Sequence, residues 1–514
     1  VTGVQTCALP ILKWVQLFYN KIRSAVLVDG YRSGFFFPSR GVRQGCPLSP
    51  LLYVISIEVL AAALRANSDI SGLKPSGLCR CLPTISLYAD DTSVITSSDS
   101  AIRATFSTYD LFERGTGSKL NLAKCRGLWL GSWRGRQDPP VAIQWTSGMI
   151  KILGIFIGHG DLEVANWMPR IEAVEKCLAS WRGRALSFSG RAVVLNALAL
   201  SRIWYVASLV FLPSWALTRL NSAVFGFFWA GKRELVARNV VRQPKDKGGF
   251  SVVSIESKIF SLLVQWVRRL EACPNGWVYL LTYWLLDRYG LTIPIALSGS
   301  VEVDWELLPP FYCSLFQAWT ALKGSWSPTT GFSFGSPAVG GPFPILNASC
   351  KSCYLTLVES TSVQPHCVAK FGPQYGPLDW ESIWTSLSLM PLDRKVEDLS
   401  WKIAHGVLYT AERLNGFGYS VPLSCFCGSP LESLDHLFFL CPLAQSGLSW
   451  IQSLLFAAAP RAPLLGIKHV LFGFSRDDLR SFPRVFSYLL GVCKMGVWCQ
   501  RNDFRFRGIR PSAV

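Results

Sequence analysis

A pair of adjacent aspartates between two short strand-forming runs limits the local structure and the chemistry that this chain can have. Residues 85–95 read ISLYADDTSVI, so β-branched and aromatic residues flank Ala89, Asp90 and Asp91, which have low strand propensity. This pattern predicts a strand, a tight turn and a second strand, with both carboxylates at the hairpin tip. Adjacent carboxylates on a turn offer oxygen ligands to hard divalent cations such as Mg²⁺. Taken alone, an Asp-Asp pair is more often ordinary polar turn chemistry.

Charge and composition narrow the class of protein. The 514 residues include 51 Lys and Arg against 33 Asp and Glu, which gives a formal net charge of +18, and 50% of them are hydrophobic. Such a chain is neither disordered nor fibrous, and its length suggests roughly three or four compact units. The positive excess favours a polyanionic partner, nucleic acid first. On charge alone, an equal alternative is that the basic surface merely keeps an apolar chain soluble.

Cysteine usage and hydropathy argue against a disulfide-rich secreted protein and against a membrane protein. The 16 cysteines are scattered along a long chain, which favours reduced thiols over a disulfide framework. No basic-then-apolar secretory leader opens the chain, and the longest charge-free stretches are interrupted by Gly, Pro, Ser or Cys. We therefore expect no membrane partner.

The segment before the aspartates predicts a loop that leads into a helix. Residues 43–50 read RQGCPLSP, with Ser49 as the expected N-cap and Pro50 at the first helical position. The apolar residues that follow share one face of this helix: Leu51, Ile55 and Val59.

Beyond the aspartates the chain changes character several times. Apolar residues at helical spacing predict a helix over 167–200, with a break at Ser189-Gly190. Residues 232–247 hold six basic residues and two acids. We expect this segment, more than the basic C-terminal tail, to bind phosphates. Residues 324–347 are rich in Gly, Pro and Ser and predict a linker. The basic residues expected on the nucleic-acid backbone are Lys232, Arg233, Arg238 and Arg242.

The tail interleaves aromatic residues with arginines. Such a pattern can stack on unpaired bases and contact phosphates, as in single-strand binding. We favour the alternative, a helix end that packs its aromatic rings on the core. The residues concerned are Trp498, Phe504 and Phe506 with Arg501, Arg505, Arg507 and Arg510.

A second constellation consists of Cys425, Cys427, His436 and Cys441. Three thiolates and an imidazole suit tetrahedral Zn²⁺, although the first pair is C-x-C where C-x2-C is usual. The alternative is a cysteine-rich helix end that His436 caps. A looser set has zinc-like spacing too, but its first pair fits one turn of an amphipathic helix, so we interpret it as structural: Cys350, Cys353, His366 and Cys367.

In their order and spacing the motifs resemble the palm of reverse transcriptases. Tyr88-Ala89-Asp90-Asp91 resembles the YADD box, and RQGCPLSP the template and nucleotide loop. LNLAKC at 120–125 is similar to the motif after YADD, and ILGIFIG at 152–158 to the primer-grip hairpin. The finer resemblance is to non-LTR, LINE-type retrotransposon polyproteins, particularly their Tx-like vertebrate branch. It extends from residue 12 to the end through WRGRALSFSGRAVVLNALALSRIWYVASLVFLP at 181–213, WKIAHGVLYTAERL at 401–414 and CFCGSPLESLDHLFFLCP at 425–442.

This resemblance sets the expected fold and domains. It implies an α+β fold class, with a partial right-hand polymerase palm and fingers followed by a mostly helical thumb, a connector and a small zinc-knuckle-like C-terminal region. The expected parts are fingers and palm at 12–160, thumb at 161–231, basic helical connector at 232–323, linker at 324–347, helical connector at 348–424, zinc-knuckle-like segment at 425–441 and helical basic C-terminal region at 442–514.

The resemblance also implies roles for single residues. Asp90 would bind the catalytic Mg²⁺ with Asp91 beside it, and Tyr88 would pack near the primer terminus. Lys124, or failing it Lys119, would face the pyrophosphate as a cation or proton donor. The remaining roles are Arg43 near phosphate, Gln44 and Gly45 for close approach of the backbone to nucleotide and template, and Leu153 and Gly154 in the primer grip. Outside this context, Arg43 and the lysines would be solvated loop charges.

Two features of the sequence depart from the family. Residues 1–11, VTGVQTCALPI, resemble a translated sequencing adaptor, and we set them aside. The segment of the form FxDxxKAFD that carries the family's first catalytic aspartate does not occur, nor does the upstream endonuclease. We therefore expect a fragment with an incomplete two-metal site and negligible polymerase activity as given.

The sequence thus predicts part of an RNA-directed DNA polymerase that acts in target-primed reverse transcription by two-metal nucleotidyl transfer. The implied partners are an RNA template, nicked or target DNA and deoxynucleoside triphosphates, in a ribonucleoprotein of the nucleus and cytoplasm. The implied cofactors are Mg²⁺ and a structural Zn²⁺, the latter because the family carries a Cys-Cys-His-Cys knuckle at this point. Two alternatives stand beside it: a non-catalytic nucleic-acid-binding remnant of a retroelement, and a group II intron maturase-like protein, in which the Cys/His segment has no place.

Overall fold

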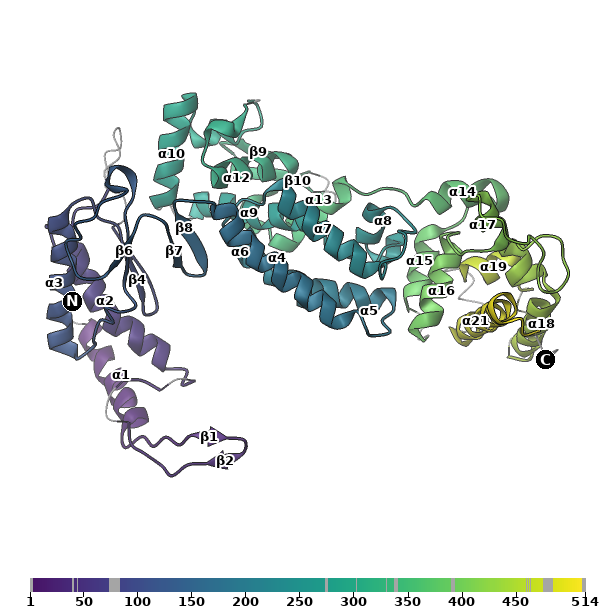
Figure 1. Cartoon of the computed structure of the whole chain (residues 1–514), viewed down its shortest axis with the longest axis horizontal. Coiled ribbons are helices and arrows are strands. Elements are labelled where there is room, and N and C mark those ends of the chain that lie inside the picture. The colour runs from purple at the N-terminus through teal and green to yellow at the C-terminus, as the bar shows by residue number, and fades with distance from the viewer. Residues whose placement is uncertain are drawn as a thin grey trace. The chain divides into compact units, whose positions relative to one another are not determined.

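The chain forms two compact units, Val1–Ser147 and Gly148–Val514. The computed structural model describes residues 3–38, 41–43, 45–73, 84–272, 276–301, 303–329, 331–336, 341–389, 393–458, 460, 462, 464–474 and 484–510. Both units are helical with small sheets, so the mixed helix and strand composition is as expected (Figure 1). The expected boundary at residue 160 differs from the division into units, which falls before the 149–158 hairpin.

In its described residues, the first unit combines three α-helices and one short 3-10 helix with three pairs of short strands. Its small core is made by Leu60 and Leu64 with Ile70, and Ile85 packs against it. Residues 3–11, which we had set aside, form the first part of α1. The elements are α1 Gly3–Tyr19, β1 Leu27–Val28, β2 Tyr31–Arg32, α2 Ser49–Ala66, β3 Ile85–Tyr88, β4 Asp91–Val94, α3 Asp99–Thr116, β5 Arg126–Leu128, η1 Gly131–Trp133 and β6 Gln144–Thr146.

The N-cap of helix α2 lies one residue earlier than predicted. Leu48 occupies the N-cap without a side-chain hydrogen bond, and Ser49 is already helical. The Ser49 hydroxyl lies 2.9 Å from the Tyr19 hydroxyl of α1 and is buried there, so it serves packing between helices instead of capping. The apolar face of Leu51, Ile55 and Val59 is exposed, whereas Leu60, Ala61 and Leu64 are buried. By length and composition alone, α2 is the one described helix that could cross a membrane.

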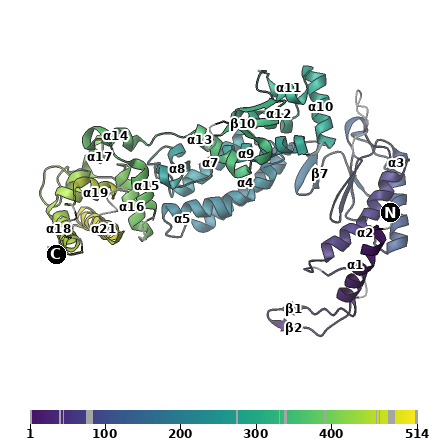
Figure 2. The same cartoon turned by 180° about the vertical axis from the view of Figure 1, so that it is seen from behind.

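The second unit is built around one extended hydrophobic core that includes residues from Trp167 to Val497. Helix α9 packs against α12 and α13 near its centre (Figures 1 and 2). The elements as far as the predicted linker are β7 Met149–Ile152, β8 Ile155–Gly158, α4 Leu162–Trp181, α5 Phe188–Val193, η2 Val194–Ala199, η3 Leu200–Arg202, α6 Trp204–Ala207, α7 Ser214–Phe228, α8 Arg238–Arg242, η4 Lys245–Lys247, α9 Ile255–Ala272, α10 Gly276–Tyr289, α11 Ile293–Ala296, η5 Trp305–Leu307 and α12 Pro310–Ala321.

The rest of the second unit is almost entirely helical after a small sheet. Its elements are β9 Gly324–Ser327, β10 Gly331–Ser336, β11 Gly341–Pro344, η6 Ile345–Asn347, α13 Cys350–Ser360, α14 His366–Tyr375, α15 Trp380–Leu389, α16 Arg394–Ala404, α17 Ala411–Gly416, η7 His436–Leu440, α18 Pro442–Ala458, α19 Ile467–Phe472 and α21 Arg484–Arg507.

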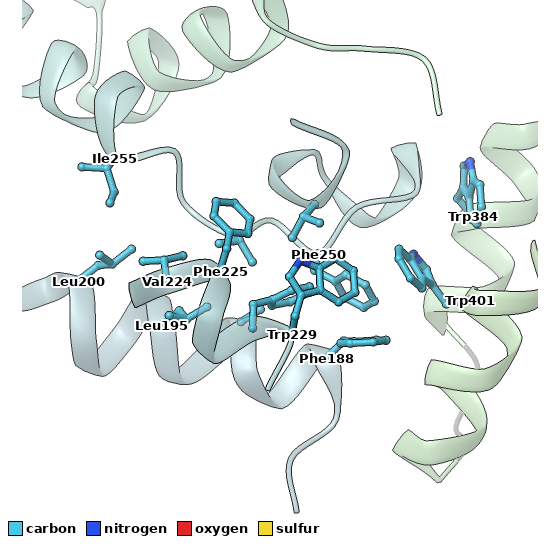
Figure 3. Packing of buried hydrophobic residues seen from close by; sticks show 14 of the residues in the cluster. Phe188, Leu195, Leu200, Val224, Phe225, Trp229, Phe250, Ile255, Trp384 and Trp401 are labelled. Carbon is cyan, nitrogen blue, oxygen red and sulfur yellow. The ribbon is translucent and has the colours of Figure 1, made fainter. Parts of the chain in front are cut away.

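An aromatic cluster joins segments that are far apart in the sequence. Phe188 at the start of α5 lies between Trp229 and Trp401, with ring centroids 5.4 and 5.5 Å away, and Phe250 is 4.9 Å from Trp401 (Figure 3). The Trp401 indole also donates a hydrogen bond to the Gly248 carbonyl at 2.9 Å. Aromatic packing therefore connects α5 and α7 with α16.

The predicted break in the 167–200 helix is at the wrong position. The helix expected over 167–200 breaks at residues 182–187, and Ser189-Gly190 lie inside the first turn of α5. The reason is capping: the Ser187 hydroxyl accepts a hydrogen bond from the Gly190 N–H at 3.1 Å. The Asp398 carboxylate accepts the Phe188 N–H from another part of the chain, at 3.1 and 3.2 Å.

The predicted linker at 324–347 is a three-stranded antiparallel sheet in the order β11-β10-β9. Phe332 and Phe334 of β10 are buried in the main core. Gly324 supplies close approach: a Cβ there would lie 2.1 Å from the Trp319 indole. Glycine thus lets β9 lie directly on an aromatic ring, and its presence does not indicate flexibility.

Candidate metal centres

The aspartate hairpin has the geometry that the sequence predicted. Strands β3 and β4 are antiparallel, and Tyr88 pairs with Asp91. Ala89 and Asp90 make the two-residue turn, and Ala89 has a positive φ of 52°, which is uncommon for a residue with a side chain. Asp90 is therefore in the turn and Asp91 is the first residue of β4, and both are exposed.

The tip of this hairpin lies near α2 and α3. Burial raises the pKa of Tyr53 in α2, and the negative charge of Asp90 raises it further. Burial also raises the pKa of Tyr109 in α3, against a hydrogen bond with Thr92 of β4. The helix that follows the 43–50 loop is thus brought next to the aspartates.

The 43–50 loop turns tightly before α2. Gly45 has a φ of 82°, and the Cys46 N–H donates to the Arg43 carbonyl at 3.4 Å. The Arg43 guanidinium lies over the Tyr19 ring, 5.9 Å from its centroid, with a buried Nε that has no hydrogen-bond partner. Arg43 is therefore not simply a solvated loop charge. Gln44 lies outside the described residues.

The two candidate lysines stand on the surface. Lys124 follows a turn in which its N–H donates to the Asn121 carbonyl at 3.0 Å, and its side chain is exposed. Lys119 is also exposed. Their assignment to the leaving group stays a prediction.

The hairpin at 149–158 has a turn of the same length. Ile152 pairs with Ile155, and the intervening Leu153 and Gly154 both have positive φ, at 46° and 85°. Two positive φ values define the turn type that matches strand twist. The Tyr205 hydroxyl of α6 donates to the Leu153 carbonyl at 2.5 Å and thereby holds the turn against α6.

The basic patch is smaller than the sequence predicted. Lys232 and Arg233 are exposed, but Arg238 forms an ion pair with Glu234 at 2.7 Å. Arg242 donates to the Asn221 side chain at 2.9 Å, and burial lowers its pKa. Two of the four cations are thus engaged by neighbouring side chains of the fold, and the contact of all four with phosphates stays a prediction.

The Cys/His cluster comes together as a metal site would require. The ligand atoms of Cys425, Cys427, His436 and Cys441 all lie within 4.8 Å of one another. A tetrahedral zinc with bonds of about 2.0–2.3 Å needs ligand atoms roughly 3.3–3.8 Å apart, so the residues fit. The thiol of Cys427 is already 3.2 Å from His436 Nε2. Among the described residues, no other group of three or more His, Cys, Asp or Glu is so placed.

The short C-x-C pair is accommodated by a turn. The Cys425 N–H donates to the Ser429 carbonyl at 2.8 Å, the Gly428 N–H donates back to the Cys425 carbonyl at 3.0 Å, and Gly428 has a φ of 93°. A hydrogen bond from the Cys425 thiol lowers the pKa of Cys441, which favours the thiolate, the form that binds metal. His436 is in η7 and faces the thiols.

A buried carboxylate behind this cluster was missed by the sequence analysis. Glu432 has no exposed side-chain surface and forms ion pairs with Arg501 at 2.7 Å and Arg505 at 3.1 Å. It also accepts the Ala411 N–H at the start of α17 at 2.9 Å. The alternation of arginines with aromatic residues in 498–507 was the available signal. The prediction that the aromatic rings pack on the core is confirmed for Trp498 and wrong for Phe506, whose side chain is exposed to solvent.

The looser cysteine set contains no metal-like cluster in the described part of the chain. Cys353 and Cys367 are buried, and burial raises the pKa of each to about 12. These thiols are packed as small apolar groups, as the structural interpretation predicted.

Comparison with known families matches two segments of the chain. The family described as reverse transcriptase (RNA-dependent DNA polymerase) matches residues 3–157, a range that includes the aspartate hairpin and most of the 149–158 hairpin. The family described as zinc-binding in reverse transcriptase matches residues 349–447, a range that includes all four residues of the Cys/His cluster.

Three individual proteins are similar to parts of the chain. The transposon TX1 uncharacterized 149 kDa protein of Xenopus laevis is 31% identical over 242 residues, 46% of this chain. An uncharacterized mitochondrial protein of Arabidopsis thaliana is 39% identical over 69 residues, 13% of this chain. The retrovirus-related Pol polyprotein from type-1 retrotransposable element R2 of Popillia japonica is 27% identical over 114 residues, 22% of this chain. The matches span 18%, 57% and 18% of these proteins, respectively.

Proposed function

The chain carries a reverse transcriptase domain related to those of LINE-type, non-LTR retrotransposons, and we propose that it is part of an RNA-directed DNA polymerase. Its reaction is the transfer of deoxynucleotides to a DNA 3′-hydroxyl on an RNA template, primed by nicked target DNA. The ribonucleoprotein that carries it works in the nucleus and cytoplasm.

One observation carries this proposal: the exposed hairpin tip with Asp90 in the turn and Asp91 at the start of β4. Two exposed carboxylates on adjacent residues fit a hard cation. When bound, Mg²⁺ would stabilise negative charge on the attacking and leaving oxygens. The chain's own contribution is to hold both carboxylates on a short turn next to α2, so that their positions are fixed before substrate arrives.

The remaining predicted site residues take supporting roles in this proposal. Gly45, without a side chain, lets the nucleotide and template approach the loop, and Arg43 supplies positive charge there. Lys124 faces the leaving pyrophosphate as a cation or proton donor. Leu153 and Gly154 orient the primer strand through the turn that Tyr205 holds. Lys232 and Arg233, the two free cations of the basic segment, contact backbone phosphates.

The Cys/His cluster has a structural role in the proposal. Cys425, Cys427, His436 and Cys441 would hold Zn²⁺ with four protein ligands, which leaves no open position for a substrate. The zinc would hold Cys425 and Cys427 against His436 of η7 and so fix the 425–441 segment, which also contains Glu432. Through its hydrogen bonds, Glu432 connects this segment to α17 and α21, so the zinc would also stabilise the ends of these helices.

The test is RNA-templated primer extension with Mg²⁺. The 514 residues hold two carboxylates of a site that uses a third, so we expect negligible extension by this chain alone. Addition of the family's upstream aspartate segment should give extension on an RNA template. Robust extension by the 514-residue chain would contradict the proposed site, and no extension by the longer chain, with RNA binding retained, would favour the non-catalytic remnant.

A further inference from the structure

A cavity of about 790 Å³ lies in the second unit between the 235–240 segment, α14 and α17. Its volume is in the range of small-molecule sites, about 300–1,000 Å³. None of the residues of the two candidate metal centres lines this cavity. Its lining is largely apolar, with Leu235, Val236, Val240, Val363, Val407 and Phe417 among the residues.

Three cations gather at one edge of this cavity. The guanidinium groups of Arg233 and Arg413 lie over the ring of Phe417, 5.0 and 5.2 Å from its centroid. Lys370 and Arg413 both donate hydrogen bonds to the Gly406 carbonyl, the lysine at 3.4 Å. Partial burial lowers the pKa of Lys370, and the positive charge of Arg413 lowers it further.

These charges form no direct ion pair within the described residues. None of Arg233, Lys370 and Arg413 forms a salt bridge there, although the negative charges of Glu412 and Asp435 act on Lys370. Arg413 Nε is buried without a hydrogen-bond partner. The nearby Asp435 carboxylate already accepts hydrogen bonds from Tyr375 and Gln374. Like charges held together without a direct ion pair repel one another, and a bound anion would relieve this repulsion.

We propose that this cavity binds one nucleotide unit of a single-stranded nucleic acid, with the phosphate on Arg413, Lys370 and Arg233 and the base inside. A nucleotide has the same two halves as the cavity, an anionic phosphate and a flat base with apolar faces. Phe417 and the valines face the base, and guanidinium groups can also stack on it. A base paired in a duplex could not enter, so the site selects single strands.

The inference rests on the proposed function in one respect, that the chain binds nucleic acid. Its test uses the full chain and three labelled probes, namely a single-stranded RNA, the same RNA with one abasic position at a time, and its duplex. Arg233→Gln combined with Lys370→Gln removes two phosphate contacts at exposed side chains. Lys323→Gln combined with Lys351→Gln is the matched control, because it removes the same charge from exposed positions elsewhere in the second unit.

A second variant fills the cavity without a change in charge. Val363→Trp places a large ring at a half-exposed lining position whose backbone carbonyl, not its side chain, accepts the Gln243 hydrogen bond. Thermal unfolding of each variant checks that it folds. Arg413→Lys serves as a third variant, since it keeps the charge but loses the planar donor that phosphate recognises.

The Arg233/Lys370 variant should bind single-stranded RNA about tenfold more weakly and with a flatter salt dependence, whereas the control should lose about threefold or less. Val363→Trp should weaken binding of the intact RNA and leave that of the abasic RNA unchanged. If all variants bind like the wild type, the inference is overturned while the proposed function stands. If only the charge variants weaken binding, the site holds phosphate alone. A wild-type chain that binds no RNA would instead refute the proposed function.

Discussion

At the scale of single residues, Ala89 combines a strained backbone with the position before the two aspartates. A positive φ costs a residue with a side chain about 1–2 kcal/mol, and glycine avoids this cost. Glycine in turn loses about 0.4–1 kcal/mol through the greater freedom of the unfolded chain. Ala89→Gly should therefore stabilise the first unit by about 0.5–1 kcal/mol in a urea titration. A loss of stability would show that the Ala89 methyl group makes a packing contact that outweighs the strain.

Glu432 is a residue whose removal should be costly. Its carboxylate is fully buried between Arg501 and Arg505, and Glu432→Ala leaves the buried Arg501 charge unpaired. The loss of one partner of a buried ion pair costs about 3–5 kcal/mol. We expect a fall of this size in the unfolding free energy of the second unit, and a smaller fall for Glu432→Gln.

The matched control for Glu432 is Glu412→Ala, an exposed acid at the neighbouring helix start, which should change stability by no more than about 0.5 kcal/mol. Equal effects at both positions would mean that the arginines contribute little to holding α21.

At the scale of elements, the junction between α5 and α16 should respond to pH. Burial raises the pKa of Asp398 to about 6, while the hydrogen bond from Phe188 lowers it less strongly. The folded chain therefore holds this proton more tightly than the unfolded chain, whose aspartates titrate near about 3.9. Its contribution to stability is present below about pH 4 and is lost as pH rises to about 6.

Asp398→Asn removes this loss. The stability of the variant relative to the wild type should rise between about pH 4 and pH 7 by up to about 3 kcal/mol, measured by denaturant unfolding at each pH. Burial lowers the pKa of His405 to about 4, which gives a pH dependence of opposite sign, but His405 is present in both proteins and cancels. A difference between the two proteins that does not vary with pH would show that Asp398 stays ionised throughout.

The zinc-knuckle element couples metal binding to folding. The purified full chain should contain about one equivalent of zinc by elemental analysis, and chelation should increase hydrogen exchange in η7 and α18, because structural zinc contributes on the order of 10 kcal/mol. His436→Ala should lose the metal, while His366→Ala, an exposed histidine of the same unit, should keep it. A folded wild-type chain without zinc would favour the helix-end alternative.

The sequence predicted those elements whose cause is local. The aspartate hairpin and the 149–158 hairpin follow from strand propensity on both sides of a two-residue turn, and the Cys/His cluster from ligand spacing. The errors arose where distant residues decide. Asp398, far along the chain, accepts the first N–H of α5, and Trp319 gives Gly324 a packing reason that composition alone does not reveal.

In the whole molecule, which has a net charge of +18, some basic side chains are bonded to other parts of the fold and others form no ion pair among the described residues. Arg242 donates a hydrogen bond to Asn221, and Arg501 and Arg238 form ion pairs with Glu432 and Glu234. Arg233, Lys370 and Arg413 form no described salt bridge. Composition predicted a polyanionic partner but could not distinguish these two groups, because the difference lies in which acids the fold brings near each cation.

If Asp90 holds the metal of an RNA-directed DNA polymerase, its removal should abolish extension and leave the fold intact. In a chain that carries the upstream aspartate segment of the family, the rate of Mg²⁺-dependent primer extension on RNA is compared between wild type, Asp90→Asn and Asp110→Asn. Asp110 is an exposed aspartate of α3 in the same unit, paired with Arg114. We predict that Asp90→Asn lowers the rate by at least about a hundredfold and Asp110→Asn leaves it unchanged. Extension by Asp90→Asn at the wild-type rate would show that Asp90 does not hold the catalytic metal.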